Sequence, residues 1–288
     1  LEEAISKYEK ARVKKETKLV SKPPVNEMIT KINLSNLVFL KKIGEGQFGS
    51  VFAVKDKVSG KLYALKAISI SQVNDDGLEK HIICEKEVLT LIKGCHHLVD
   101  LQGYFRDKFY IYFLLEFIRG MELFDVIRVM DLLDNDQAKY YVASMILALE
   151  QLHNKSIVYR DLKPENVMID EKGQLLLIDM GTAKVLNNSK KGLARTYTIL
   201  GTPHYMAPEI LKGKGYDFAV DIWSLGICMY EFMCGLVPFG EECDDPYEVY
   251  QLISSQSLSY PNYFKDKKNK LARNLIEQLL NRNPNSRT

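Results

Sequence analysis

The chain has 288 residues, which is enough for one large domain or two smaller ones. With 46% hydrophobic and 26% charged residues, its composition is that of an ordinary soluble globular protein. The net charge of +2 creates no overall field that would attract nucleic acid, so we expect no nucleic-acid partner. The longest apolar run, residues 110–115, is far too short for a transmembrane segment.

The cysteines indicate the compartment. There are five of them, an odd number, and none forms a C-x-x-C pair. This pattern argues against a disulfide framework and for a reducing environment, so we expect a cytoplasmic protein. The chain begins with Leu1 and ends directly after Arg287-Thr288. We therefore expect it to be a piece of a longer protein, whose missing regions could still associate with a membrane.

Residues 1–34 are expected to form an extension or linker. Apolar side chains recur at positions 1, 5, 8 and 11, which is one narrow stripe on a helix. The proline pair at 23–24 would end that helix.

Residues 35–117 read as a β-rich part with one helix. Apolar runs at 38–40, 51–54 and 110–115 predict strands. Residues 78–93 have helical periodicity, and the apolar positions of this helix are Ile82, Ile83, Val88, Leu89 and Ile92.

Residues 118–288 read as mainly helical. Residues 271–280 predict a closing helix. Residues 135–153 form a long amphipathic segment, whose apolar positions are Ala138, Tyr141, Val142, Ile146, Leu149 and Leu152. Residues 220–233 are almost wholly apolar, as expected of a buried central helix. The stretch 116–120 is expected to be the hinge between the two parts.

Residues 43–51 read Ile-Gly-Glu-Gly-Gln-Phe-Gly-Ser-Val. Glycines let the backbone approach phosphates and expose N–H donors. A dinucleotide fingerprint has a similar glycine spacing but requires a strand, then a helix. Here both flanks predict strands, which argues against that alternative. No G-x-x-x-x-G-K-[ST] sequence is present, so a Walker-type site is excluded as well.

The most informative motif is at residues 159–166, which read Tyr-Arg-Asp-Leu-Lys-Pro-Glu-Asn. Thirteen residues after Asn166 come Asp179, Met180 and Gly181. The two stretches supply an Asp to accept a hydroxyl proton, a Lys to steady a phosphate, and an Asn and a second Asp for Mg²⁺. Phosphoryl transfer needs this set, because its chemistry is mostly positioning and neutralisation of charge.

These motifs resemble those of the eukaryotic protein kinases. Residues 201–209, Gly-Thr-Pro-His-Tyr-Met-Ala-Pro-Glu, match the end of the family's activation segment, and the resemblance covers roughly residues 35–288. It implies an α+β fold of two lobes, with an N-terminal extension at 1–34, a β-rich N-lobe at 35–117 and a mainly helical C-lobe at 118–288. The family uses ATP and Mg²⁺, and the nucleotide is expected to lie between the lobes.

The resemblance also assigns roles to residues. Asp161 and Lys163 would be catalytic, together with Lys66 and its partner Glu85, for which Glu87 is the alternative. Asn166 and Asp179 would bind Mg²⁺. The nucleotide-binding residues would be Ile43, Gly44, Glu45, Gly46, Gly49, Val51, Ala64, Lys66, Glu116, Ile118, Glu122 and Glu165. Glu209 is expected to form a buried ion pair with Arg287. Met180 stands where the family usually has Phe, and it keeps that position apolar.

Within the family, the chain resembles the AGC group of Ser/Thr kinases, and most of all the cGMP-dependent kinases of protists. Residues 202–209, 213–216, 220–223, 230–235 and 244–250 carry this resemblance. It implies that Thr198 is a phosphosite whose phosphate would meet Arg160 and Lys184. Residues 185–192 read as an exposed insertion before it.

The same resemblance implies protein substrates with basic residues before Ser or Thr, recognised by Glu122, Glu165 and Glu231. A cyclic-nucleotide-binding region would lie outside this piece of chain. The alternatives are another AGC kinase such as a cAMP-dependent catalytic subunit, a pseudokinase scaffold, or a small-molecule or lipid kinase of the same fold. The complete 201–209 segment speaks against the last of these.

Overall fold

The computed structural model describes residues 32–46, 49–75, 77–186, 195–198 and 200–287. The helix expected within residues 1–20 lies outside the described residues, and so does most of the expected insertion at 185–192. The chain divides into two compact units. The first runs to Lys80 and also contains residues 100–118, and the second contains residues 81–99 and 119–288. The expected N-lobe contained residues 81–99, which group here with the second unit.

The first unit is built on a five-stranded sheet of order β1-β2-β3-β5-β4, with every neighbouring pair antiparallel. Its strands are β1 (Leu37–Gly46), β2 (Gly49–Asp56), β3 (Leu62–Ser69), β4 (Leu101–Arg106) and β5 (Tyr110–Glu116). Two short helices, η1 (Leu34–Asn36) and α2 (Ile70–Asp75), accompany them. The strands predicted at 38–40, 51–54 and 110–115 are therefore confirmed.

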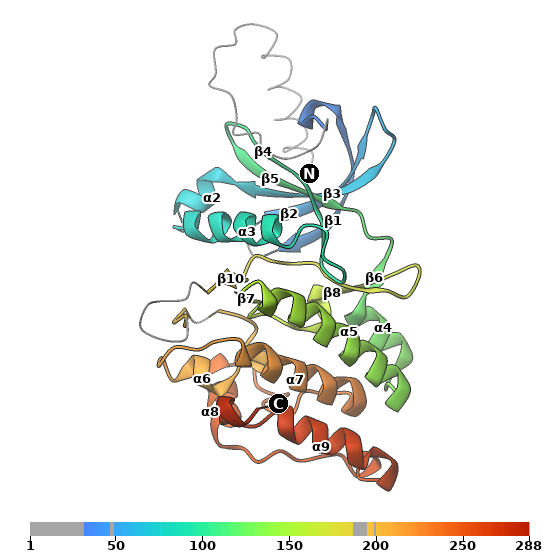
Figure 1. The fold of residues 1–288 in the computed structure, drawn as a ribbon, viewed down its shortest axis with the longest axis vertical. Coiled ribbons are helices and arrows are strands. Elements are labelled where there is room, and N and C mark those ends of the chain that lie inside the picture. The colour runs from blue at the N-terminus through green and yellow to red at the C-terminus, as the bar shows by residue number, and fades with distance from the viewer. Residues whose placement is uncertain (1–31, 47–48, 76, 187–194, 199, 288) are drawn as a thin grey trace, which may run out of the picture. The chain divides into compact units, whose positions relative to one another are not determined.

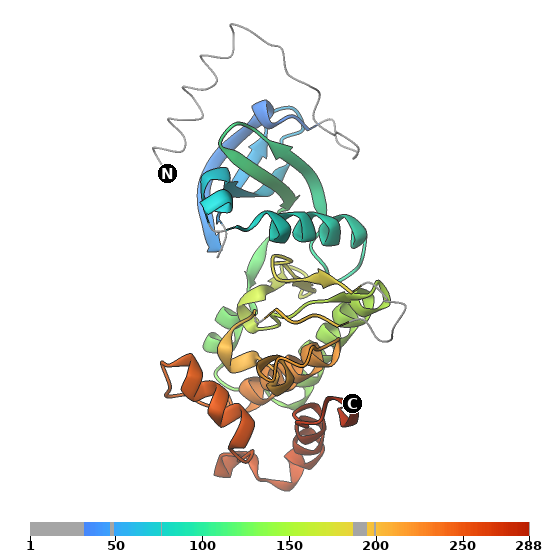
Figure 2. The same ribbon diagram turned by 90° about the vertical axis from the view of Figure 1, so that its left-hand side faces the viewer.

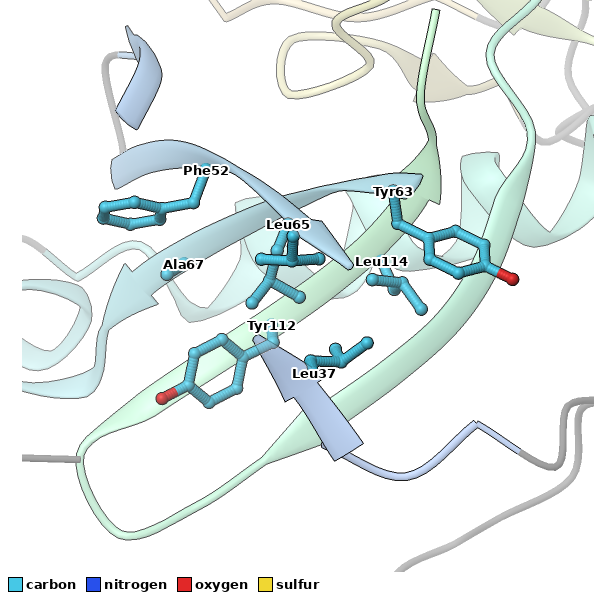
Figure 3. Packing of buried hydrophobic residues seen from close by; sticks show 8 residues of the cluster. Leu37, Phe52, Tyr63, Leu65, Ala67, Tyr112 and Leu114 are labelled. Atoms are coloured by element: carbon cyan, nitrogen blue, oxygen red, sulfur yellow. The ribbon is translucent and has the colours of Figure 1, made fainter. Parts of the chain in front are cut away.

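Alternate side chains of these strands form one core. Leu37, Phe52, Leu65 and Leu114 pack together with Tyr63 and Tyr112, as Figure 3 shows. The alternation follows from the period of two along a strand, which sends every second side chain to the same face.

The second unit is mainly helical and carries small sheets. Its α-helices among the described residues are α3 (Glu79–Leu91, whose first residues belong to the first unit), α4 (Leu123–Met130), α5 (Asn135–Asn154), the single turn α6 (Pro208–Leu211), α7 (Ala219–Cys234), α8 (Pro246–Ser255) and α9 (Lys270–Leu279). Its short 3₁₀ turns are η2 (Pro164–Asn166), η3 (Pro203–Tyr205), η4 (Asn262–Phe264), η5 (Lys267–Asn269) and η6 (Pro284–Ser286). Its strands are β6 (Gly120–Glu122), β7 (Ile157–Val158), β8 (Val167–Asp170), β9 (Leu175–Leu177) and β10 (Lys184–Val185). They pair antiparallel in the orders β6-β8-β9 and β10-β7.

The central helix of this unit is α7, which is buried along almost its whole length, as the sequence predicted. It packs against α5 and α9 (Figure 1). Gly226 makes the contact with α9 close, because a Cβ at this position would lie 2.8 Å from a side-chain atom of Leu279 and of Leu280. In the side view of Figure 2, α8 and α9 stand apart as separate helices.

Two predicted apolar positions do not face the core. Ile83 on α3 and Ile146 on α5 are exposed, whereas their neighbours Ile82 and Met145 are buried. Helical spacing predicts which side chains share an apolar face. Whether a side chain at the margin of that face is buried depends on which neighbouring elements cover it. Among the described residues, no helix combines the length and hydropathy needed to cross a bilayer.

Candidate active site

The loop at residues 159–166 connects β7 to β8 and is fixed to the central helix. The Asp221 carboxylate, fully buried at the start of α7, accepts hydrogen bonds from the Tyr159 N–H at 2.9 Å and the Arg160 N–H at 2.8 Å. His153 at the end of α5 lies with Nε2 2.7 Å from the same carboxylate. Arg160 has a φ of 73°, so the chain turns sharply here and sends the next residues away from α7.

Asp161 lies at the centre of a group of four polar side chains. Its Oδ1 accepts hydrogen bonds from the Thr202 N–H and hydroxyl, both at 3.0 Å. Its Oδ2 accepts one from Asn166 Nδ2 at 2.9 Å. Lys163 Nζ donates to the Thr202 hydroxyl at 2.7 Å and lies 3.5 Å from Asp161 Oδ2. These bonds hold the carboxylate in a single orientation next to a positive charge.

Asp179 follows β9 and lies beside the same loop. The Ile178 N–H donates to the Asn166 carbonyl oxygen at 3.0 Å, which joins the two stretches. Asp179 Oδ1 accepts from the Gly181 N–H at 2.9 Å, and Met180 between them is buried, as expected of an apolar side chain. Carboxylate and amide oxygens are the hard ligands that Mg²⁺ prefers, so the residues present fit this ion.

In the second unit, the charge of Glu165 acts on two other glutamates, Glu122 and Glu231. Burial, then the charges of Asp125 and Glu165, raise the pKa of Glu122. Burial chiefly raises the pKa of Glu231 to about 7, the nearby charges of Glu165 and Glu241 add to this, and the hydrogen bond from Tyr205 opposes it. That bond runs from the Tyr205 hydroxyl to Glu231 Oε2 at 2.7 Å. Glu165 Oε2 is buried without a hydrogen-bond partner among the described residues. The group thus combines concentrated negative charge with incomplete hydrogen bonding.

A basic group lies beside the described part of the segment that leads to Thr198. Arg160 donates through Nε to the Thr182 carbonyl oxygen at 2.6 Å and through Nη1 to the Tyr216 hydroxyl at 3.4 Å. Tyr216 in turn donates to the Thr198 carbonyl oxygen at 2.5 Å. Lys184 Nζ, however, donates to the hydroxyl of Thr196 at 3.1 Å.

His81 on α3 belongs to the same basic group. Its pKa is lowered, first by burial and then by the positive charges of Arg160 and Lys184. Arg160 is therefore linked to the Thr198 backbone through Tyr216, whereas Lys184 binds Thr196, and the charges of both act on His81. The side chain of Thr198 is exposed. Thr196 is buried instead.

In the first unit, the space available for a side chain differs between two glycines of the 43–51 stretch. A Cβ on Gly49 would lie 2.2 Å from the Ala67 carbonyl oxygen, so the sheet itself demands glycine there. A Cβ on Gly44 would meet only Val51, at 3.8 Å, which is ordinary contact. The fold does not require glycine at position 44, whereas a closely approaching phosphate would.

The other expected nucleotide-site residues are distributed over both units. Lys66 and Ala64 lie on β3, and Lys66 is buried. The Glu116 N–H at the end of β5 donates to the Asp100 carbonyl oxygen at 3.0 Å. In the second unit, Glu85 on α3 is buried, whereas Glu87 is exposed.

Ile43, Glu45 and Gly46 lie on β1, and Val51 lies on β2. Ile118 follows β5 and is half-buried.

A model of the protein kinase domain matches residues 37–288. The chain belongs to the protein kinase family. The resemblance inferred from the motifs is thereby confirmed, as is the α+β architecture that it implied. ATP and Mg²⁺ are the general requirements of protein kinases.

The kinases to which the chain is similar include three with informative names. It is 43% identical over 258 residues to a cGMP-dependent protein kinase of Plasmodium berghei (strain Anka), with 90% of this chain and 29% of that protein covered. It is 42% identical over 259 residues to the cGMP-dependent protein kinase of Toxoplasma gondii, with 90% of this chain and 25% of that protein covered. It is 38% identical over 248 residues to a Caenorhabditis elegans protein described as cAMP-dependent protein kinase, catalytic subunit-like, with 86% of this chain and 59% of that protein covered. The chain thus spans under a third of the length of the first two relatives.

Several residues of this kinase site were not singled out from the sequence. Thr202 and Asp221 hold the 159–166 loop, and His81 joins the basic group. Thr202 belongs to the recognisable stretch 201–209, so a local signal for it existed. His81 carries no local signal, because only the tertiary fold brings α3 next to Arg160.

Proposed function

We propose that this chain is a catalytic domain that transfers the γ-phosphate of ATP to Ser or Thr hydroxyls of protein substrates. The observation that carries the proposal is the group formed by Asp161, Lys163, Asn166 and Thr202. The Asp161 carboxylate accepts hydrogen bonds from the Asn166 amide and the Thr202 hydroxyl, and the Lys163 ammonium lies 3.5 Å away. The carboxylate can therefore bind a substrate hydroxyl while the ammonium contacts the transferred phosphate.

Each side chain then has a definite task. Asp161 orients the substrate hydroxyl and takes its proton, and Thr202 keeps the carboxylate in place. Lys163 offsets the negative charge of the transferred group. Asn166 and Asp179 supply the oxygens for Mg²⁺. Bound there, Mg²⁺ would neutralise charge on phosphate oxygens.

The first unit is proposed to bind the nucleotide. Gly44 leaves room for a phosphate, and buried Lys66 would contact the α- and β-phosphates. Since the Glu116 N–H is engaged with Asp100, adenine recognition at Glu116 would use the carbonyl oxygen. Ile43, Val51 and Ala64 are the proposed apolar contacts of the base.

We further propose that substrates carry basic residues before the acceptor Ser or Thr. Glu122, Glu165 and Glu231 support this, because the charge of Glu165 raises the pKa of both Glu122 and Glu231, and an arginine would offset that unfavourable interaction. Glu165 Oε2, buried without a hydrogen-bond partner among the described residues, offers an acceptor for a guanidinium.

Regulation is proposed to follow the relatives. Phosphorylation of exposed Thr198 would draw Arg160, and with it Lys184 and His81, into charge-assisted bonds.

Dependence on cGMP would act through regions outside this chain, in analogy with the names of its relatives. A cytoplasmic location is supported by five cysteines that are all free. A cAMP-dependent catalytic subunit is the second candidate, since one relative bears that description.

The test is phosphate transfer from Mg-ATP to a short peptide with arginines before a single Ser, using wild type and Asp161→Asn. We expect nucleotide affinity to be retained in Asp161→Asn, and turnover to fall about 10²- to 10⁴-fold with the loss of the general base. Near-normal turnover by this variant would remove the assignment of Asp161. If the wild type binds ATP but transfers nothing even with Thr198 phosphorylated, the scaffold alternative replaces the kinase proposal. Stimulation of the longer parent protein by cGMP rather than cAMP would decide the subfamily.

A further inference from the structure

A basic surface covers η5 and the start of α9, which contain none of the candidate active-site residues. Four lysines occur within six positions, at 265, 267, 268 and 270, and all four side chains are exposed. Asp266 is the only acidic residue between positions 262 and 276. Helix α9 lies along the lower margin of the second unit in Figure 1. These four residues are called the lysine surface below.

An apolar side chain stands out among these lysines. Leu271 is 82% exposed and follows Lys268 by three positions, a spacing that places two side chains on the same side of a helix. Leu275, one turn further along α9, is also exposed, whereas Ile276 and Leu279 are buried where α9 packs against α7. Leaving a leucine in water adds nothing to the stability of the fold, so its burial is available to a partner.

The backbone under the lysine surface is held in place by hydrogen bonds. Arg273 Nη1 donates to the carbonyl oxygens of Phe264 at 2.7 Å and of Asp266 at 3.1 Å. Buried Asn269 donates to the same Phe264 oxygen at 3.3 Å, and its Oδ1 accepts from Asn135 Nδ2 of α5 at 3.2 Å. The lysines are therefore presented on a preformed frame.

The fold itself does not account for the lysines. None of the four forms an ion pair with a carboxylate of the described residues. Asp134 and Asp136 flank the contact that Asn135 makes from α5, and Asp134 is engaged in capping that helix. The first turn of α9 contains no acidic residue, and positive charge at the start of a helix opposes the helix dipole. A negatively charged partner would offset this unfavourable arrangement.

We propose that the lysine surface and Leu271 bind the surface of an anionic lipid membrane. The lysines would contact the negatively charged headgroups, and Leu271 and Leu275 would enter the boundary between headgroups and acyl chains. Such binding is peripheral and reversible. It needs no catalytic activity, so it stands apart from the proposed function, and it would concentrate the chain next to substrates at a membrane.

Charge and hydrophobicity together select among anionic partners. A nucleic-acid backbone would satisfy the lysines but offers no apolar contact to Leu271. An acidic polypeptide would have to order the long lysine side chains, which costs conformational entropy. A two-fold dimer through this face would bring like charges together. A lipid surface presents phosphates directly above an apolar layer, and this matches exposed lysines around an exposed leucine.

The first test is cosedimentation of the whole 288-residue chain with vesicles. Phosphatidylcholine vesicles with about 30% phosphatidylserine should bind the chain in about 0.1 M NaCl, and about 0.5 M NaCl should release most of it. Pure phosphatidylcholine vesicles should bind little. No binding to the phosphatidylserine vesicles, or equal binding to both kinds of vesicle, would overturn the proposal.

The lysines are tested by Lys267→Gln combined with Lys268→Gln. Each lysine near an anionic surface strengthens binding about fivefold, so this double variant should bind about 25-fold more weakly. The matched control combines Lys155→Gln with Lys214→Gln, which removes the same charge from exposed positions of the same unit and should bind like wild type. Equal loss in the two double variants would mean that net charge alone decides, and no loss in the first would place the binding in other basic residues of the chain. Either result would overturn the proposal.

The leucine distinguishes a membrane from other anionic partners. Leu271→Ala should weaken binding to the phosphatidylserine vesicles about tenfold, because part of an apolar side chain no longer leaves water. Val129→Ala should have no effect, since Val129 is 81% exposed on the same unit but lies on α4. If Leu271→Ala bound like wild type, the surface would recognise charge alone, and an acidic polypeptide or a nucleic acid would replace the membrane as its partner.

Insertion is measured directly with Leu271→Trp. Trp223 is the single tryptophan of the chain and is fully buried, so a change in emission on adding vesicles would come from position 271. Phosphatidylserine vesicles with brominated acyl chains should quench this fluorescence and should leave that of Val129→Trp unchanged. Quenching in neither variant, or equally in both, would contradict the insertion of Leu271.

Discussion

Arg287 binds Glu209 through two parallel hydrogen bonds, although 78 residues separate them in the sequence. Nη1 lies 2.6 Å from Oε1 and Nη2 lies 3.0 Å from Oε2. Nη1 also donates to the Ala219 carbonyl oxygen at 2.6 Å, and the guanidinium lies over the Trp223 ring, 5.3 Å from its centroid. The arginine side chain is fully buried. This pair, expected from the sequence, joins the end of the chain to α6 and α7.

Breaking this pair should be costly. Arg287→Met leaves the Glu209 carboxylate without its partner, and the loss of one member of a buried pair typically costs about 3–5 kcal/mol. Urea unfolding followed by fluorescence or circular dichroism would measure the change. The control is Lys42→Met, whose partner Glu45 is exposed and whose pair should contribute almost nothing. Equal stability of Arg287→Met and wild type would contradict the structural role.

Thr202 should act by positioning Asp161. Thr202→Val removes the hydroxyl that binds both Asp161 and Lys163, so we expect kcat to fall about 10- to 100-fold with little change in the KM for ATP. Thr202→Ser retains the hydroxyl and should recover most of the rate. Failure of serine to rescue, or a loss confined to KM, would mean that the hydroxyl does not position the carboxylate.

Glu231 should make stability and specificity depend on pH. Its pKa in the folded chain is raised to about 7 from 4.5, so the folded state holds the proton more tightly than the unfolded state does. The resulting stabilisation is complete below pH 4.5 and is lost as the pH rises toward about 7. Urea midpoints at pH 5 and pH 8 should therefore differ less in Glu231→Gln than in wild type. If the urea midpoints of Glu231→Gln and wild type changed equally with pH, this prediction would be wrong.

The same pKa predicts when arginine is recognised. The Glu231 carboxylate becomes charged near pH 7, so preference for a peptide with Arg over its Ala version should increase between pH 6 and pH 8. In Glu231→Gln that increase should disappear.

Glu122 provides an independent test of substrate choice. Glu122→Ala should weaken a peptide with Arg before Ser about tenfold, the effect of losing one charge-assisted contact, and should spare a peptide without Arg. The kcat/KM values of both peptides measure this. Equal loss on the two peptides would assign Glu122 to the nucleotide or to the fold instead. Glu150→Ala, an exposed change on α5, is the control.

Phosphorylation of Thr198 should be visible at His81. At present, burial and the charges of Arg160 and Lys184 lower the pKa of His81. A phosphate beside these groups would offset the positive charges and raise that pKa, which histidine NMR would detect. Thr198→Val should lose the shift and lower the activity about tenfold. Modification of buried Thr196 instead of Thr198, found by mass spectrometry, would contradict the assignment.

The sequence predicted the regular elements well where periodicity was long. Helices α5, α7 and α9 begin and end within one residue of the expected bounds, because a long apolar pattern is a local signal. Helix α5 also has a capping box at its start, formed by Asp134 and Gln137.

Which helix side chains are buried by neighbouring elements was harder to predict. Ile83 and Ile146 were placed on apolar faces but are exposed, since nothing in the local pattern tells where a neighbouring element ends.

For the candidate site, the residues within the motifs were predictable and their supports were not. Asp161 and Asn166 are five residues apart, so the sequence shows them together. The hydrogen bond from Lys184 to the Thr196 hydroxyl was not predicted from the sequence, and the meeting of Lys184 with a phosphate on Thr198 stays a prediction. A lysine's long side chain reaches several groups, and only packing decides among them.

Asp221 has a consequence for motion. One buried carboxylate holds the Tyr159 and Arg160 amides and contacts the end of α5, from within the most deeply packed helix of the unit. These two amides cannot exchange their hydrogens with solvent unless α7 moves. Their exchange should follow the global unfolding of the unit rather than local breathing of a loop. The backbone that presents Asp161 is thus anchored to the core of the unit through Asp221.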